Sequence, residues 1–481
     1  MKKYRRCVPQ AGGPVLHEHE GRLAADGTKY ISYRTVLVPA LPLMASSAVQ
    51  IVLSLTDAWF IGRISTPALA AVGAVQLMVL ALVLVFGGVA AAVQTVVGQC
   101  WGAGHYRRAA EATWMALWAA LCLAPLLVAL ASASHMILAP LGFDPRVESL
   151  AAQFWFPRVL GTSFGVAVSA MFGFFTGIGH VHITLRVTLI MALANIVFNQ
   201  LFIFNMGFGV AGSGWATTAA QICGLLFSLA VFLSMPYRNS YQSHLTWRPE
   251  LGKVLRQLRI GLPMALLPAA DLLAYSAFQM MQVRLGAAAG AATQIVMSLT
   301  WITYIPGAGI ASAGTTLVGQ SIGAGDRVRA MRLGTRVILL TSFCMASIGV
   351  LLVLTGTRLI RFFVGAHDVE AVHTVALAAK LMWVAAPYQL FDGFTLGSTL
   401  CLRGAGDAMV PMALALTVSW LMFVPLAHSL TFAPGQGWVN FIPQFGWGTV
   451  GGWSALLLYR MVLGMGLFAR WRAGAWQRIC I

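Results

Sequence analysis

The sequence predicts an all-α polytopic membrane protein with twelve transmembrane helices, arranged as two six-helix lobes related by a pseudo-twofold axis along the membrane normal. Three observations lead to this fold: an apolar composition, a succession of long apolar runs and an internal repeat. Of the 481 residues, 59% are hydrophobic and only 9% are charged. This amount of polar surface is too small to enclose a water-soluble core. We therefore expect the chain to lie in a lipid bilayer.

The apolar runs are each long enough for one spanning helix, which needs about 20 residues to cross about 30 Å of hydrocarbon. They are continuous, whereas the strands of a membrane β-barrel alternate between apolar and polar residues. We predict helices over residues 36–59, 70–97, 112–137, 150–176, 187–205, 210–235, 261–284, 291–320, 337–356, 376–401, 409–431 and 448–468.

The basic residues predict the orientation of the chain. With the N-terminus inside the cell, 23 of the 31 lysines and arginines fall in the tails and internal loops, and five fall in external loops. The other three, Arg158, Lys380 and Arg460, lie within or near helix ends. This asymmetry predicts a multi-pass protein of the cell inner membrane with both termini cytoplasmic. The net charge of +17 therefore indicates topology, and we expect no nucleic-acid partner.

An internal repeat divides the chain into halves. Residues 97–104 read VGQCWGAG and residues 318–325 read VGQSIGAG, an offset of 221, and the same offset relates Leu41-Pro42 to Leu262-Pro263. An even number of spans separates the copies, so both halves have the same orientation in the membrane. We assign a cytoplasmic tail to 1–35, the N-lobe to 36–236, a cytoplasmic linker to 237–260, the C-lobe to 261–470 and a second cytoplasmic tail to 471–481.

Three acidic residues, Asp57, Asp271 and Asp392, fall inside apolar runs, whereas the other eleven lie in tails or loops. An Asp at the centre of a spanning helix costs about 2.5 to 3.5 kcal/mol on insertion scales, which makes it a functional candidate. Such a carboxylate can neutralise a bound cation or take up a proton. Two structural alternatives stay open: Asp57 could reach the interface from near its helix end, and the other two could form a buried hydrogen-bonded pair.

Polar residues near these acids extend the candidate set. Asn195 and Asn199 share one helix face, so their amides could line a polar path or join two helices. Tyr388 lies one turn before Asp392 on the same face. We find no pair of histidines spaced as metal ligands, no nucleophile elbow and no phosphate-binding loop. The sequence therefore predicts neither an enzyme nor a resident cofactor or metal.

Several motifs together resemble the multidrug and toxic compound extrusion (MATE) family, over about residues 35–476. Besides the two VGQ turns, they are LP at 41–42, DAWFIG at 57–62, ALAAVG at 68–73 and LRGAGD at 402–407. The resemblance implies a secondary active exporter of lipophilic organic cations, coupled to Na⁺ or H⁺ and working by alternating access. We expect it to act as a monomer on small cationic drugs.

The resemblance also implies roles for individual residues. Asp57, Asn195, Asp271 and Asp392 match acidic or amide positions of the family, and Gln294 and Tyr388 fall where cavity residues of its bacterial branch lie. Asn199 stands where some members have Asp, and Asp271 stands where many have Glu. Asp271, Tyr388 and Asp392 are then the candidates for binding transported Na⁺.

Two rival functions stay open at this stage. A flippase of the same superfamily would move a lipid-linked oligosaccharide and would need a wider and more basic cavity, whereas the buried charges predicted here are acidic. An intramembrane enzyme would show turnover without transport. Two repeats in register do not favour a receptor or a channel.

Overall fold

The computed structural model describes residues 32–141, 144–363, 369–439 and 441–479, so residues 1–31 of the predicted N-terminal tail and the last two residues of the C-terminal tail lie outside it. Twelve helices in the described part are long and apolar enough to cross a membrane, one for each predicted run. The predicted all-α fold is confirmed.

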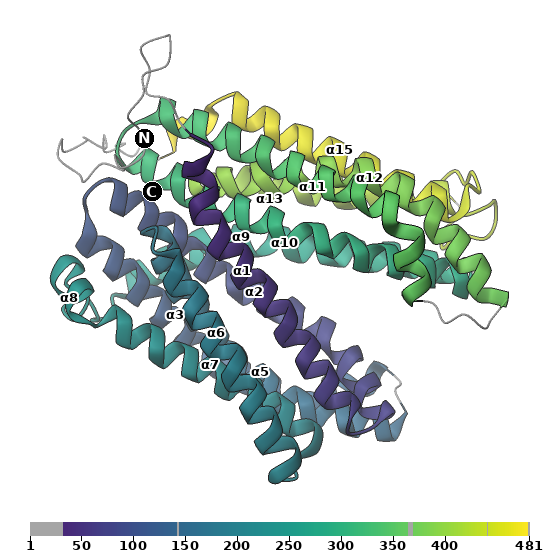
Figure 1. Ribbon diagram of the computed structural model, residues 1–481, viewed down its shortest axis with the longest axis horizontal. Helices are drawn as coiled ribbons and strands as arrows, with labels where there is room; N and C mark the ends of the chain where they lie inside the picture. The colour runs from purple at the N-terminus through teal and green to yellow at the C-terminus, as the bar shows by residue number, and fades with distance from the viewer. Residues whose placement is uncertain (1–31, 142–143, 364–368, 440, 480–481) are drawn as a thin grey trace.

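The helices alternate in direction through each lobe (Figure 1). The first lobe contains α1 (Arg34–Gly62), α2 (Thr66–Gly102), α3 (Tyr106–Ser132), the short α4 (Ser134–Leu138), α5 (Pro145–Gly177), α6 (Val181–Asn199) with its π-helical extension η2 (Gln200–Asn205), and α7 (Gly209–Phe232). The second contains α9 (Leu251–Arg284), α10 (Ala287–Gly323), α11 (Arg327–Phe363), α12 (Val369–Gly404), α13 (Met409–Thr417) with the π-helical η3 (Val418–Phe423) and α14 (Val424–Thr431), and α15 (Gly448–Arg472). The short α8 (Met235–Tyr241) lies between the lobes in sequence.

The two lobes approach each other at one end and splay apart toward the other, as Figure 1 shows. We call the first the converging end, where α2 and α10 terminate at Gly102 and Gly323. The first helix of each lobe packs against the other lobe, with α1 against α10 and α9 against α2. Gly309 of α10 lies against Met44 of α1, and Gly88 of α2 lies against Ala265 of α9. These two contacts are related by the sequence offset of 221.

Glycines in the left-handed region end the helices at the converging end. Gly104 and Gly325 follow α2 and α10 with φ of 72° and 81°, and Gly179 and Gly406 follow α5 and α12 with φ of 86° each. Only glycine adopts this conformation without steric cost. The repeated glycine motifs are therefore two copies of one turn, which supports the pseudo-twofold arrangement.

Reciprocal hydrogen bonds join the lobes at this end. Nε2 of Gln99 donates to the Gly404 carbonyl at 3.1 Å, and Nε2 of Gln320 donates to the Gly177 carbonyl at 2.8 Å. The hydroxyls of Thr95 and Thr316 likewise donate to the carbonyls of Arg403 and Thr176, each at 3.0 Å. Each bond has its counterpart in the other lobe, so the converging end is a self-complementary contact between the two repeats.

The stretch 237–260, which the sequence predicts to be a linker, contains more helix than expected. It includes most of α8, and α9 already begins at Leu251. Val254 and Gln257 are buried, whereas Arg256 and Arg259 of the same turns are exposed. Nε2 of Gln257 donates to the carbonyl of Val89 on α2. This amphipathic first segment is too polar to be identified as a spanning helix, but it packs against the other lobe.

We predict that Gly323→Ala lowers the melting temperature of the purified protein. An added Cβ would overlap the backbone carbonyl of Gln99, and overpacking of this kind costs about 1 to 3 kcal/mol. Gly73→Ala in α2 is the matched control, because a Cβ there meets no atom within 4 Å. Both substitutions gain about 1 kcal/mol of helix propensity. Equal stabilisation of both variants in tryptophan-fluorescence melts would contradict the close crossing of α2 and α10.

Candidate functional site

A cluster of acidic, basic and tyrosine side chains lies inside the C-lobe. It is formed by three helices, with Asp271 and Tyr275 on α9, Tyr388 and Asp392 on α12, and Tyr459 and Arg460 on α15. The two residues from α9 and the two from α12 are each four positions apart, so each pair projects from one helix face. We call these six residues the C-lobe cluster.

Arg460 lies at the centre of the C-lobe cluster. Its Nη1 is 3.3 Å from Oδ2 of Asp271, and its Nε is 3.1 Å from Oδ1 of Asp392. The side chain of Arg460 is 7% exposed, and those of Asp271 and Asp392 are 15% and 13% exposed. One guanidinium therefore faces both carboxyl groups, so the acidic side chains of the cluster outnumber the basic one.

Tyrosines complete the hydrogen bonding of this ion pair. The hydroxyl of Tyr459 donates to Oδ1 of Asp271, and Nε and Nη2 of Arg460 donate to the Tyr275 hydroxyl. That hydroxyl is also 2.9 Å from the hydroxyl of Tyr388. The guanidinium carbon lies 5.2 Å from the centre of the Tyr275 ring and 5.1 Å from that of Tyr459. Arg460 is thus held by charge, hydrogen bonds and cation-π contacts together.

A second cluster lies inside the N-lobe. Oδ1 of Asp57 on α1 accepts a hydrogen bond of 2.7 Å from Nδ2 of Asn199 on α6, and Oδ2 accepts one of 3.5 Å from the Thr217 hydroxyl on α7. The same Nδ2 of Asn199 also donates to Oδ1 of Asn195 at 2.9 Å. Both asparagines are fully buried. We call Asp57, Asn195, Asn199 and Thr217 the N-lobe cluster.

The N-lobe cluster differs from the C-lobe cluster in its balance of charge and hydrogen bonds. Arg158 of α5 interacts electrostatically with Asp57 but forms no ion pair with it within 4.0 Å in the described residues. The buried Oδ1 of Asn199 accepts no hydrogen bond from any described residue. A carboxylate, amide oxygens and a hydroxyl are ligands suited to a small hard cation.

The seven predicted site residues lie in three separate parts of the structure. Asp57, Asn195 and Asn199 meet in the N-lobe cluster, whereas Asp271, Tyr388 and Asp392 meet in the C-lobe cluster. Gln294 lies on α10, is exposed, and forms no side-chain hydrogen bond with the other six in the described part of the chain. The acids therefore do not share one cluster.

Sequence reasoning predicted Tyr388 but missed the basic members of the clusters, two of the three tyrosines and Thr217. The expectation that the buried charges are acidic is incomplete, because Arg158 and Arg460 accompany the three aspartates. A signal was available for Arg460, because an intramembrane arginine is as costly as an intramembrane aspartate and so demands a partner. Tyr275 and Tyr459 carry no comparable signal in the sequence, where they resemble ordinary packing residues.

Comparisons with known proteins identify the family. The MatE family model matches residues 42–201 and 263–428, well over half of the chain. This chain belongs to the MATE family. A relative called "Probable multidrug resistance protein NorM" from Agrobacterium fabrum is 27% identical over 434 residues, covering 87% of this chain and 92% of that protein. Its namesake from Bradyrhizobium diazoefficiens is 28% identical over 448 residues, covering 90% and 92%.

Solved MATE structures have the same fold. A crystal structure of MATE in complex with MaL6 superposes with a TM-score of 0.81 at 18% identity, covering 92% of this chain and 95% of that one. An outward-facing multidrug resistance MATE family transporter gives a TM-score of 0.78 at 17% identity, over 91% and 95%. The match confirms a MATE fold of two six-helix lobes in a multi-pass membrane protein.

We predict that Arg460→Met lowers the stability of the protein by about 3 to 5 kcal/mol, because it leaves two buried carboxylates without their shared counter-charge. Adding Asp392→Asn to this variant restores part of the loss. Lys253→Met is the control, because Lys253 pairs with Glu111 and Glu250 on the surface, where an ion pair contributes about 0 to 1 kcal/mol. Thermal melts of the four proteins measure these effects. If Asp392→Asn further destabilises the Arg460→Met protein, the proposed charge balance is wrong.

Proposed function

We propose that this chain is a secondary active multidrug transporter that exports lipophilic organic cations in exchange for Na⁺ or H⁺. The MATE fold and the curated relatives called multidrug resistance proteins support export of small molecules. The observation that supports the ion coupling is a largely enclosed acidic cluster in each lobe. A buried carboxylate responds to any cation that neutralises it, which gives an ion-dependent switch.

The N-lobe cluster is the better candidate for the coupling ion. Asp57 has no bonded counter-charge among the described residues. The unpartnered Oδ1 of Asn199 would become a further oxygen ligand if the amide, which now donates from Nδ2 to Asp57, turned over. A proton on Asp57 would use the same place, because it would remove the negative charge and add a donor. Binding of either ion would change the contacts between α1 and α6.

The C-lobe cluster, to which the sequence analysis assigned Na⁺, already contains a cation. A sodium ion or drug that approaches Asp271, Tyr388 and Asp392 would compete with the Arg460 guanidinium for the same oxygens. We propose that the second acidic side chain, when ionised, attracts the positive group of the drug while Arg460 limits the affinity of the cluster for it. A bound drug can then be released without a large energetic cost.

Alternating access would follow from opening the converging end. A ligand must prefer one state by about 5.5 kcal/mol to shift a two-state equilibrium from about 1:99 to 99:1. Four neutral hydrogen bonds of about 0.5 to 1.5 kcal/mol each, joining Gln99, Gln320, Thr95 and Thr316 to the opposite lobe, have a comparable total. Ion binding at one carboxylate is therefore of the right magnitude to compete with this contact.

We predict that the converging end faces the cytoplasm, since the basic residues gather in the tails and the loops assigned to that side. The structure would then be open toward the periplasm. Single cysteines are placed at His105 and at Ala433 in a cysteine-free background. A membrane-impermeant maleimide added to intact cells should label residue 433 alone, and it should label both residues once the cells are permeabilised. Labelling of residue 105 from outside would reverse this orientation.

We predict that Asp57→Asn and Asp392→Asn each slow efflux of ethidium at least tenfold in proteoliposomes with an imposed sodium or proton gradient. The amide keeps the size of the side chain and removes its charge. Imposing the two gradients separately identifies the coupling ion of the wild-type protein. Efflux that responds to neither gradient would refute ion exchange.

Glu111→Gln is the control for these variants, because Glu111 is a surface carboxylate paired with Lys253. It should retain efflux within twofold of the wild-type protein. If Asp57→Asn and Asp392→Asn also export at the wild-type rate at equal protein density, the two clusters are structural and coupling occurs elsewhere.

A further inference from the structure

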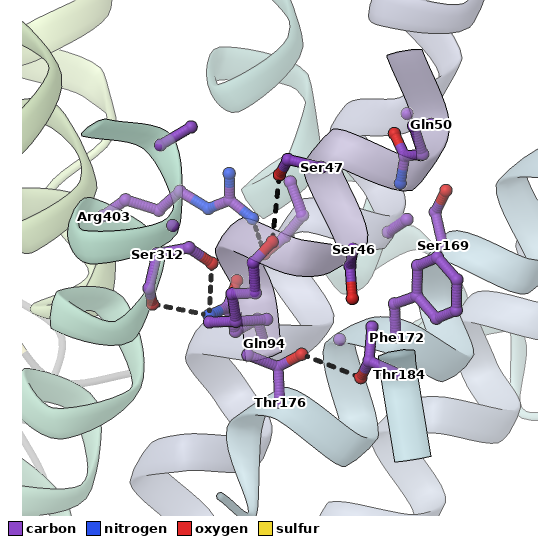
Figure 2. A pocket seen from close by; sticks show the side chains of 17 residues that line it. Ser46, Ser47, Gln50, Gln94, Ser169, Phe172, Thr176, Thr184, Ser312 and Arg403 are labelled. Carbon is purple, nitrogen blue, oxygen red and sulfur yellow. Dashed lines mark hydrogen bonds between the residues drawn. The ribbon is translucent and has the colours of Figure 1, made fainter. Parts of the chain in front are cut away.

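A cavity of about 290 Å³ lies between the two lobes. It is lined by α1, α2, α5 and α6 from the N-lobe and by α10 and α12 from the C-lobe (Figure 2). No residue of the N-lobe or C-lobe cluster lines it. It is therefore separate from both clusters, and its walls move apart whenever the lobes do.

The lining of this cavity is polar and has a single sign of charge. Arg403 is the one charged side chain among its lining residues in the described chain, and no carboxylate accompanies it. The other polar lining residues are neutral: Ser46, Ser47, Gln50, Gln94, Ser169, Thr176, Thr184 and Ser312. A cavity with this lining attracts anions and repels cations.

The Arg403 guanidinium has hydrogen-bond donors that no protein group uses in the described residues. Figure 2 shows its side chain reaching from α12 into the space between Ser47 and Ser312. Nη2 donates to the carbonyl of Ala91 at 2.8 Å, and Nη1 forms no hydrogen bond in the described residues. Nε is enclosed by protein and has no partner there either. Arg403 also lacks a carboxylate within ion-pair distance there, in contrast to Arg460, which has two. A half-buried guanidinium without a counter-charge is only partly solvated, so an incoming anion would be favoured.

We propose that this cavity binds a carboxylate group of the transported solute, with Arg403 as its anchor. A guanidinium presents its donors in a planar fork that matches the two oxygens of a carboxylate. The side-chain amide of Gln50, which forms no hydrogen bond in the described part of the chain, supplies a neutral donor on the opposite wall. The cavity thus offers a separate subsite for the carboxylate of a solute, with Arg403 as the residue that selects for it.

This inference rests on the proposed export function, and α1 connects the two. Gln50, Ser54 and Asp57 lie at intervals of four and three residues, so they share one face of α1. The rise from Gln50 to Asp57 is about 10 Å at 1.5 Å per residue. A polar track therefore leads from the anion site to the N-lobe cluster, along which the positive group of a zwitterionic solute can lie while its carboxylate contacts Arg403.

The test uses two dyes that differ only at the carboxylate: rhodamine 110, a free acid, and rhodamine 123, its methyl ester. Binding to the purified full-length protein is measured by fluorescence polarisation in detergent. We expect Arg403→Gln to weaken binding of the acid at least tenfold more than binding of the ester. An equal change for both dyes would overturn the proposal.

A second variant separates binding from lobe contact, because Arg403 also joins the two lobes. Thr95→Val removes the hydrogen bond from the Thr95 hydroxyl to the Arg403 carbonyl and leaves the guanidinium in place. It should keep the preference of the wild-type protein for the acid. If Thr95→Val loses that preference as Arg403→Gln does, Arg403 acts only by holding the lobes together, and the proposal fails.

Two further measurements identify the kind of anion that the site binds and separate failure of this inference from failure of the proposed export function. Chloride and inorganic phosphate, titrated against gluconate at constant ionic strength, should displace rhodamine 110 only above about 100 mM. Displacement at about 1 mM would instead assign the site to an inorganic ion. If the wild-type protein exports neither dye, the proposed function fails, whereas export of the ester alone with no effect of Arg403→Gln on the acid refutes this inference only.

Discussion

The contact between α2 and α10 at the converging end is the constraint on which the rest of the molecule depends. It brings Gly102 and Gly323 against the backbone of the opposite helix, where a larger side chain would not fit. Gln99 and Gln320 then reach the carbonyls that end α12 and α5. Because this contact sets the relative position of the lobes, it also defines the interlobe cavity and separates the two acidic clusters.

In each cluster, the partners of the acidic side chains come from other helices of the same lobe. Asp57 receives its partners from α6 and α7, and Asp392 receives Arg460 from α15. A helix that shifts relative to its neighbours therefore alters the ligands of a buried charge, and a change in that charge shifts the helix. Under the proposed ion coupling, this mutual dependence would link ion binding to movement of the helices.

The fold was largely predictable because apolar runs and glycine turns are local in sequence. All twelve spans appear, and VGQ at 97–99 and 318–320 occupies equivalent places in the two lobes. The site was only partly predictable. Its acids are conspicuous in apolar surroundings, but the distribution of Asp57 and Asp392 between two clusters depends on how the helices pack. The pairing of Arg460 with residues from α9 and α12 depends on that same packing, and a single sequence does not reveal which faces of the helices meet.

The self-complementary surface at the converging end has a consequence for assembly. In a twofold-symmetric dimer, each subunit offers the same patch to its partner, and the pairing closes because both copies are used. Here the two copies are the repeats containing Gln99 and Gln320, and they belong to one polypeptide. The two repeats thus pair as the subunits of a covalently linked dimer would. Because each copy of this surface is covered by the other, neither is exposed to a second chain while the converging end is closed.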